Sequence, residues 1–200
     1  DVSQGVPLEY PSTEIIDLEL ADSAQYHREV LHNGLTVIVK SSPGSQVFAM
    51  NVLGKHRTAN EPESKTGITD FVNRCLDKGT VTRSAEELSR DLARIGAQVT
   101  LNDNPWIPYD DRYTSRVFSF CRFETIDEFA ERGFHLFCEM LLHPSFEPEQ
   151  IEQVRGEMQM VLGRQMASPR NVARDGYYET LFAGTDYAHS IMGSMRTVSM

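Results

Sequence analysis

Three polar side chains at helical spacing form the best candidate for a chemical site in this chain. Asp70, Asn73 and Arg74 stand at i, i+3 and i+4, so on a helix they share one face. In zinc-binding helices of this spacing, two histidines hold the metal and a glutamate takes a proton from its bound water. Arginine has no lone pair for a metal, and asparagine cannot accept that proton. We therefore expect no catalytic residue and no zinc cofactor here, but an ion pair between Asp70 and Arg74.

Composition indicates an ordinary globular chain with a surplus of acid. The 200 residues are 40% hydrophobic and 24% charged, and the net charge is −10. This length suffices for one buried core. The acidic surplus argues against nucleic-acid binding, and no apolar run approaches the roughly 20 residues of a membrane span. We expect a soluble protein, cytoplasmic or exported to the periplasm. Residues 1–7 lack the features of a signal peptide, but a signal could have been removed, so the compartment stays open.

The cysteines favour packing over chemistry. They are Cys75, Cys121 and Cys138. No two of them form a C-x-x-C motif, so neither a zinc knuckle nor a redox dithiol is indicated. Cys75 and Cys138 fall in apolar helical patterns, where a buried small side chain is expected.

Local signals predict the elements that position Asp70 and its neighbours. Asn33-Gly34 between β-rich runs predicts a hairpin, and residues 46–53 predict a third strand. A helix beginning near Lys65 carries the face of Asp70, and Gly79 is expected as its left-handed cap. The capping box at residues 84–87 opens a second helix that ends at Gly96. Further segments follow in order: strands at 98–101 and 113–121, and helices at 125–142, 148–168 and 169–182.

This order of elements predicts the fold class. Three strands, two helices, two strands and three helices indicate an α+β domain, with helices packed on one face of a mostly antiparallel sheet. We expect residues 1–26 to form a linker or lead-in and residues 27–200 to form a single domain. Trp106, Tyr109 and Tyr113 lie in a proline-interrupted stretch, where they would either line a peptide groove or anchor their own loop.

The chain resembles the M16 metallopeptidases, the insulinase-like and pitrilysin-like family that includes the mitochondrial processing peptidase subunits. Four segments carry the resemblance: Leu31-His-Asn-Gly-Leu-Thr-Val, the frame of residues 67–80, residues 84–97 with Ile95-Gly96-Ala97, and Tyr187-Ala-His-Ser-Ile-Met-Gly193. The resemblance covers roughly residues 27–195. The resemblance implies an M16-type α/β roll, which usually closes with residues beyond Met200, so the domain is expected to be truncated at its C-terminus.

The resemblance also implies which positions once held the metal. In active members, two motif histidines and a glutamate on a later helix bind zinc, and the motif glutamate is the general base. The histidine positions fall on Asp70 and Arg74 in this chain, and the base position falls on Asn73. The third-ligand region contains Glu152, Val154 and Glu157. A register counted back from Pro169 selects Val154, with the two glutamates as alternatives.

These replacements imply a role without chemistry of its own. By resemblance the chain is a catalytically inactive domain that forms the structural, substrate-cradling half of a zinc peptidase. The catalytic half would lie on the same or another chain and would hold the zinc, and a peptide substrate would enter between the halves. A homo-oligomer is possible. The alternative is a non-enzymatic protein-interaction or assembly module on the same fold.

Overall fold

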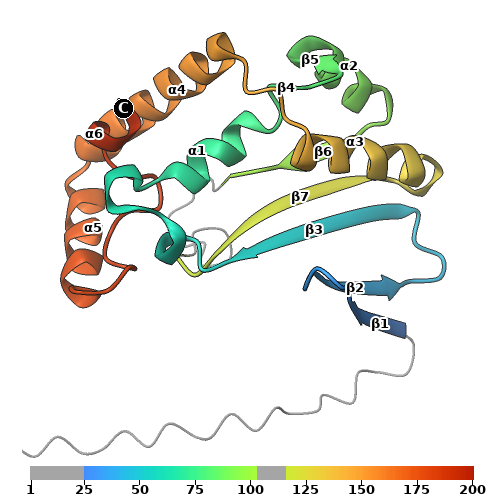
Figure 1. Cartoon of the computed structure of the whole chain (residues 1–200), viewed down its shortest axis with the longest axis horizontal. Helices are drawn as coiled ribbons and strands as arrows, with labels where there is room; N and C mark the ends of the chain where they lie inside the picture. Colours follow the sequence, from blue (N-terminus) through green and yellow to red (C-terminus); the bar gives the residue numbers. More distant parts are fainter. Residues whose placement is uncertain (1–24, 103–115) are drawn as a thin grey trace, which may run out of the picture. The chain divides into compact units, whose positions relative to one another are not determined.

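The structure, a computed structural model, describes residues 25–102 and 116–200 (Figure 1). It divides into two compact units, the first ending at Ser45 and the second spanning Gln46–Met200. Residues 1–24 of the predicted lead-in (1–26) and the aromatic stretch at 103–113 lie outside the described residues, while residues 25 and 26 belong to the first strand. The predicted domain boundaries therefore stay predictions, and each unit is described by itself.

The first unit is the predicted hairpin. Strands β1 (Gln25–Val30) and β2 (Thr36–Ser41) pair antiparallel. Within the turn only Gly34 takes a positive φ, 85°, while the side chain of Asn33 accepts a hydrogen bond from the Leu35 N–H at 3.1 Å. The Asn-Gly pair therefore turns the chain through the backbone of one residue and the side chain of the other.

The second unit contains a three-stranded antiparallel sheet. Its order is β3 (Val47–Lys55), β7 (Phe118–Ile126) and β6 (Gln98–Thr100), with Met50 opposite Phe123. The predicted end of the last strand at residue 121 was wrong, as was the helix start at 125. The strand continues because Cys121, Phe123 and Thr125 alternate toward the core, and the helix begins only at Ala130 after a 3₁₀ turn.

The helices follow the predicted order with adjusted ends. They are α1 (Ile68–Cys75), α2 (Ala85–Arg94), α3 (Ala130–Leu142), α4 (Pro148–Met166), α5 (Pro169–Leu181) and α6 (Met195–Val198). The predicted helix start near Lys65 was early, because a 3₁₀ turn at Glu63–Lys65 precedes α1. The capping box of Ser84 and Glu87 is confirmed.

Gly79 does not cap α1, which corrects the prediction. With φ of 116° it lies in the short strand β4 (Gly79–Thr80), which pairs with β5 (Arg83–Ser84). Both strands and α6 are too short for periodicity to indicate them.

Two apolar cores hold the second unit together. The first joins the sheet to α2 and α3; its fully buried members include Leu88, Phe123 and Phe137. The second joins α1 to α4 and α6, with Cys75, Val154 and Met158 at its centre. Figure 1 shows α1 and α3 above the same face of the sheet. The predicted α+β class, with helices on one face of an antiparallel sheet, is confirmed. None of the helices in the described ranges is long and apolar enough to cross a membrane.

Candidate functional site

The helix α1, which carries the candidate site, is fixed at its N-terminus by a carboxylate from outside the helix. Gly67 precedes the helix with φ of 87° and offers no side chain of its own as a cap. Glu61 instead accepts hydrogen bonds from the N–H groups of Gly67 at 2.7 Å and Thr69 at 3.1 Å. A Cβ atom on Gly67 would stand 2.5 Å from the Met192 carbonyl oxygen. A glycine is therefore required here, and a buried acid satisfies the free donors of the first turn.

Asp70 lies at the centre of the site and is fully buried. Its Oδ2 accepts a hydrogen bond from Arg74 Nε at 2.7 Å, which is the predicted i, i+4 ion pair. Its Oδ1 accepts a second one from Arg57 Nη2 at 3.2 Å. The side chain of Asp70 is 0% exposed, and those of Arg57 and Arg74 are 2% and 12% exposed. One carboxylate is therefore held between two almost fully desolvated guanidinium groups.

Arg57 reaches Asp70 through an unusual backbone path. His56 takes a positive φ of 60°, and a 3₁₀ turn (Thr58–Asn60) follows Arg57. The Arg57 N–H donates to the Val117 carbonyl oxygen at 3.2 Å, which ties the segment to the chain entering β7. Sequence reasoning missed Arg57, because nothing in a segment 13 residues before Asp70 indicates that it folds back onto the helix.

Asn102, also missed from the sequence, holds the far end of Arg74. With its carboxamide oxygen turned toward the helix, Asn102 accepts hydrogen bonds from both Nη atoms of Arg74, each at 3.0 Å. Arg74 is therefore bound at Nε and at both Nη atoms. Asn73 is half-buried, and its side chain makes no hydrogen bond to any residue in the described ranges. It takes no part in this network.

The third-ligand region on α4 presents an apolar surface to α1. Val154 is completely buried in the core that contains Cys75 of α1. The side chain of Glu152 is 68% exposed and pairs with Arg155 at 3.1 Å. Glu157 accepts a hydrogen bond from Gln153 at 3.0 Å along the same helix. Apolar packing joins α4 to α1 at Val154, and each glutamate is bound to a neighbour on its own helix.

The side chains at this site do not fit a zinc ion. Zinc requires three or four N, O or S donors in tetrahedral geometry. Both oxygens of Asp70 are taken by guanidinium groups, Arg74 has no lone pair, and Val154 has no donor atom. Burial raises the pKa of the Cys75 thiol to about 11, so it stays protonated and is a poor ligand at neutral pH. In the part of the chain that the structure describes, no three His, Cys, Asp or Glu side chains are grouped for a metal.

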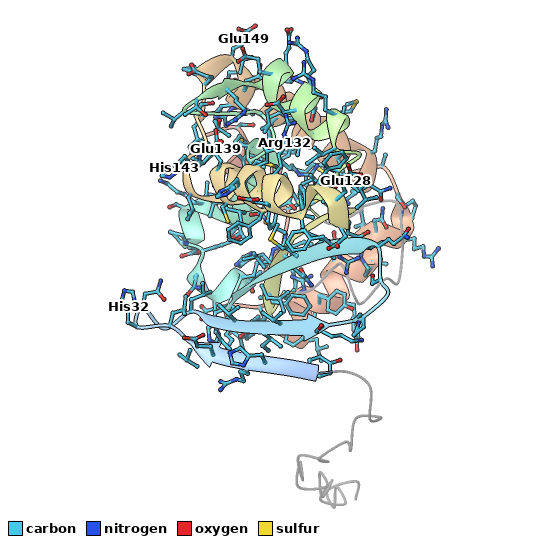
Figure 2. All side chains as sticks on the ribbon, turned by 90° about the vertical axis from the view of Figure 1, so that its right-hand side faces the viewer. His32, Glu128, Arg132, Glu139, His143 and Glu149 are labelled. Carbon is cyan, nitrogen blue, oxygen red and sulfur yellow. The ribbon has the colours of Figure 1, made fainter. Side chains whose placement is uncertain are left out.

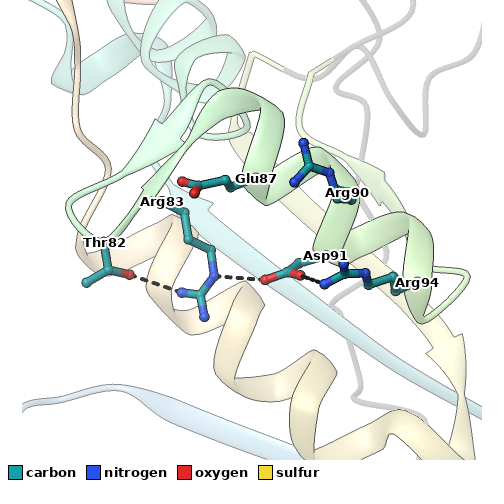
Figure 3. A pocket seen from close by; sticks show the side chains of 6 residues that line it. All are labelled: Thr82, Arg83, Glu87, Arg90, Asp91 and Arg94. Atoms are coloured by element: carbon teal, nitrogen blue, oxygen red, sulfur yellow. Dashed lines mark hydrogen bonds and ion pairs between the residues drawn. The ribbon is translucent and has the colours of Figure 1, made fainter.

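A surface hollow beside α2 offers charged groups but no reactive pair (Figure 3). Its floor is an ion-pair chain in which Asp91 accepts from Arg83 Nε at 3.1 Å and from Arg94 Nη1 at 3.0 Å. The hydrogen bond from Arg83 holds the pKa of Asp91 below its usual range. Two residues of α3, labelled in Figure 2, extend this chain: Glu139 pairs with Arg83, and Arg132 pairs with Asp91. The carboxylates here accept from arginines, which stabilises the junction of α2, β5 and α3.

Comparison with known proteins identifies the family. Residues 36–195 match the model of the family described as Insulinase (Peptidase family M16). The chain is 20% identical to the uncharacterized zinc protease YmxG of Bacillus subtilis, over 86% of this chain and 39% of that protein. It is 24% identical to the mitochondrial cytochrome b-c1 complex subunit 1 of Mus musculus, over 84% of this chain and 33% of that protein. The chain thus spans well under half the length of these relatives.

Solved structures share the fold. A peptidase M16 inactive domain from Pseudomonas fluorescens superposes with a TM-score of 0.75 at 15% identity, over 87% of this chain and 40% of that one. A protease from Helicobacter pylori superposes with a TM-score of 0.72 at 18% identity, over 88% of this chain and 40% of that one. These likenesses confirm the predicted fold. Together with the family match, they establish that the chain belongs to the insulinase family of peptidases, family M16.

Proposed function

We propose that this chain is a catalytically inactive M16 domain that acts as the structural, substrate-cradling half of a zinc peptidase. The observation that carries the proposal is Asp70, whose two carboxylate oxygens are bound by Arg57 and Arg74 on the face where active relatives hold their metal. A carboxylate bound in this way is unavailable as a metal ligand. Asn73, at the position of the family's general base, cannot accept a proton from water.

The residues that replace the metal ligands also balance their own charges without a metal ion. An active site of this family places a divalent cation among buried ligands, whereas here two guanidinium charges surround one carboxylate. Buried charges are tolerated when they are paired and hydrogen-bonded. The fold can therefore keep its motif helix without zinc, and the core at Val154 supplies the packing between α1 and α4.

Two further observations support a role beside a catalytic half. The chain spans 39% of the Bacillus relative and 40% of each solved structure, so more than half of each of those proteins lies outside the matched part. One of the solved structures is described as an inactive domain. The catalytic half would be on the same polypeptide or on a second one, and the peptide would bind between the halves.

The proposal is tested by supplying the missing half. The chain is produced alone and together with the protein encoded next to it, and cleavage of an unfolded fluorogenic peptide is measured for each preparation. We expect no cleavage by the chain alone and zinc-dependent cleavage by the pair, which is lost when the motif glutamate of the partner is replaced by glutamine. Cleavage by the purified chain alone would contradict a supporting role, whether or not Asp70→Asn abolishes it.

A second candidate function is an assembly module without any peptide role. It is favoured by the murine relative, which is named as a subunit of the cytochrome b-c1 complex. The partner that co-purifies with the chain separates the two functions. A partner with an intact H-x-x-E-H motif supports the peptidase half, and a stable complex whose members all lack that motif supports the assembly module.

A further inference from the structure

The helix α5 turns its apolar side chains outward. Six exposed residues at successive turns form one strip along the helix, here called the outer face: Val172, Ala173, Gly176, Tyr177, Thr180 and Leu181. The three large side chains of this face, Val172, Tyr177 and Leu181, are 54%, 62% and 56% exposed. Figure 1 shows α5 at the edge of the second unit opposite α2 and α3. A surface helix usually packs such a strip against the core, so its outward position here calls for a second surface.

The polar and aromatic side of α5 contacts the rest of the unit instead. Arg174 pairs with Asp175 at 3.2 Å, and both side chains are half-buried. Tyr178 stacks on Phe182 with 6.1 Å between the ring centroids, and the guanidinium of Arg116 lies 4.7 Å from the centroid of the Tyr178 ring. No residue of α5 is fully buried. The helix is therefore held by its polar side, and within the described residues its outer face stays exposed.

The shape of the outer face suits close packing against another helix. Gly176 lies at its middle, and a Cβ atom added there would meet nothing within 4 Å, so the fold itself does not require a glycine. Within a helix a glycine costs about 1 kcal/mol relative to alanine. Its missing side chain lets a second helix approach closely, and Tyr177 stands beside this gap as a large knob. A knob and a hole on one face allow that face to pack against an identical copy of itself.

The charges of α5 run against its helix dipole. Arg170 lies in the first turn and Glu179 near the end, whereas the dipole favours acids at the start and cations at the end. An antiparallel copy would bring its own Glu179 to the start of this helix and its own Arg170 to the end, which corrects both. The helix also carries two arginines and two acids, so it has no net charge, in a chain with a net charge of −10. Two copies therefore repel each other less here than at an acidic surface.

We propose that the outer face of α5 binds a second copy of this chain, with the two helices antiparallel about a two-fold axis near Gly176. One pair of helices of this length buries less than the roughly 1,200 Å² of a stable interface. The dimer is therefore weak, with a Kd of about 1–100 μM. This association goes beyond the proposed function, because it needs neither zinc nor a catalytic half.

Sedimentation equilibrium of the intact chain measures the association. We expect the average mass to rise from 22.6 kDa toward twice that value as the concentration increases from about 1 to about 200 μM. Gly176→Gln should weaken the dimer by about tenfold or more, because a long side chain then stands where the helices meet. This variant should fold, since the position is open and glutamine is a better helix former than glycine. Gly156→Gln, at an equally open position on α4, is the matched control and should leave the association unchanged.

A charge reversal tests the antiparallel arrangement. Glu179→Lys brings cations of both copies together at each end of the pair, so we expect the dimer to weaken about threefold to thirtyfold. The same change matches the charge to the dipole of its own helix, so the monomer should be no less stable. Glu29→Lys makes the same change of net charge on the hairpin, where Glu29 is 63% exposed, and should not weaken the dimer.

Three results would overturn the proposal. The first is a mass of 22.6 kDa at every concentration. The second is a dimer that Gly176→Gln leaves intact, since it uses another surface, and the third is a dimer that Glu179→Lys does not weaken, since its helices are not antiparallel. If the chain alone is monomeric and Gly176→Gln instead abolishes its binding to a catalytic half, the outer face belongs to that half and the second copy is excluded.

Discussion

Replacing Asp70 by asparagine is the perturbation that acts most directly on the buried ion-pair network. The side chain keeps its shape, but the negative charge between Arg57 and Arg74 is lost. Both guanidinium groups are then left almost fully buried, with 2% and 12% of their side chains exposed. Removing one partner of a buried pair costs about 3–5 kcal/mol, because the remaining charge is uncompensated. We therefore expect Asp70→Asn to lower the free energy of unfolding by about that amount.

Urea unfolding followed by circular dichroism measures this loss as a shift of the midpoint at constant slope. Glu152→Gln is the matched control, because it removes an ion pair to Arg155 in which the carboxylate is 68% exposed. It should cost at most about 1 kcal/mol. If Asp70→Asn costs no more than this control, Asp70 does not stabilise a buried pair, and the account of the site is wrong.

A triple replacement separates the effect of the buried charges on stability from the effect of packing. In Arg57→Met, Asp70→Leu, Arg74→Met the three charged members of the network become apolar, so none of their charges is left buried without a partner. Replacing all members of a buried network by apolar residues of similar volume is often neutral or stabilising. We expect this variant to be more stable than Asp70→Asn. A triple variant that is less stable than the single one would show that the cost comes from packing and not from charge.

Three further predictions concern the elements around the site. Gly193→Ala should cost more than about 2 kcal/mol of stability, because the new Cβ would meet the Thr66 carbonyl oxygen at 2.1 Å. Gly156→Ala, in open space on α4, should stabilise the chain by up to about 1 kcal/mol. Thermal unfolding of both variants checks this, and equal melting temperatures would contradict it. Ser84→Ala should cost about 1 kcal/mol and increase amide exchange in the first turn of α2, and an unchanged exchange rate there would show that the capping box contributes nothing. The Cys75 thiol, with its pKa raised to about 11 by burial, should react with a thiol reagent at pH 8 only after urea unfolding, and fast labelling of Cys75 in the native chain would refute its burial.

Local signals in the sequence were enough to predict much of the fold. The hairpin at Gly34 and the capping box at Ser84 depend on residues only a few positions apart, and the i, i+4 pair of Asp70 and Arg74 needs only a helix. Gly79 was misassigned because a glycine after an apolar helix suits a helix cap, whereas its positive φ here belongs to β4. Its partner strand is two residues long and leaves no periodic pattern.

The rest of the site depends on contacts between distant segments. Arg57 comes from a loop and Asn102 lies two residues beyond the end of β6, and no spacing rule relates either of them to Asp70. Glu61 caps α1 from six residues before Gly67, outside the usual capping positions. Chain folding brings these side chains together, so the sequence alone indicated the loss of the motif residues but not the network that replaced them.

Zinc binding by the isolated chain decides whether the side chains around Asp70 still hold a metal. The purified protein is stripped of metal, titrated with zinc in a calorimeter and then assayed for retained metal, beside Asp70→Asn. We predict far less than one equivalent of zinc on both proteins. Both oxygens of Asp70 are bound by arginines, and neither Arg74 nor Val154 offers a lone pair to a metal. Retention of about one equivalent by the wild-type chain, lost in Asp70→Asn, would contradict it.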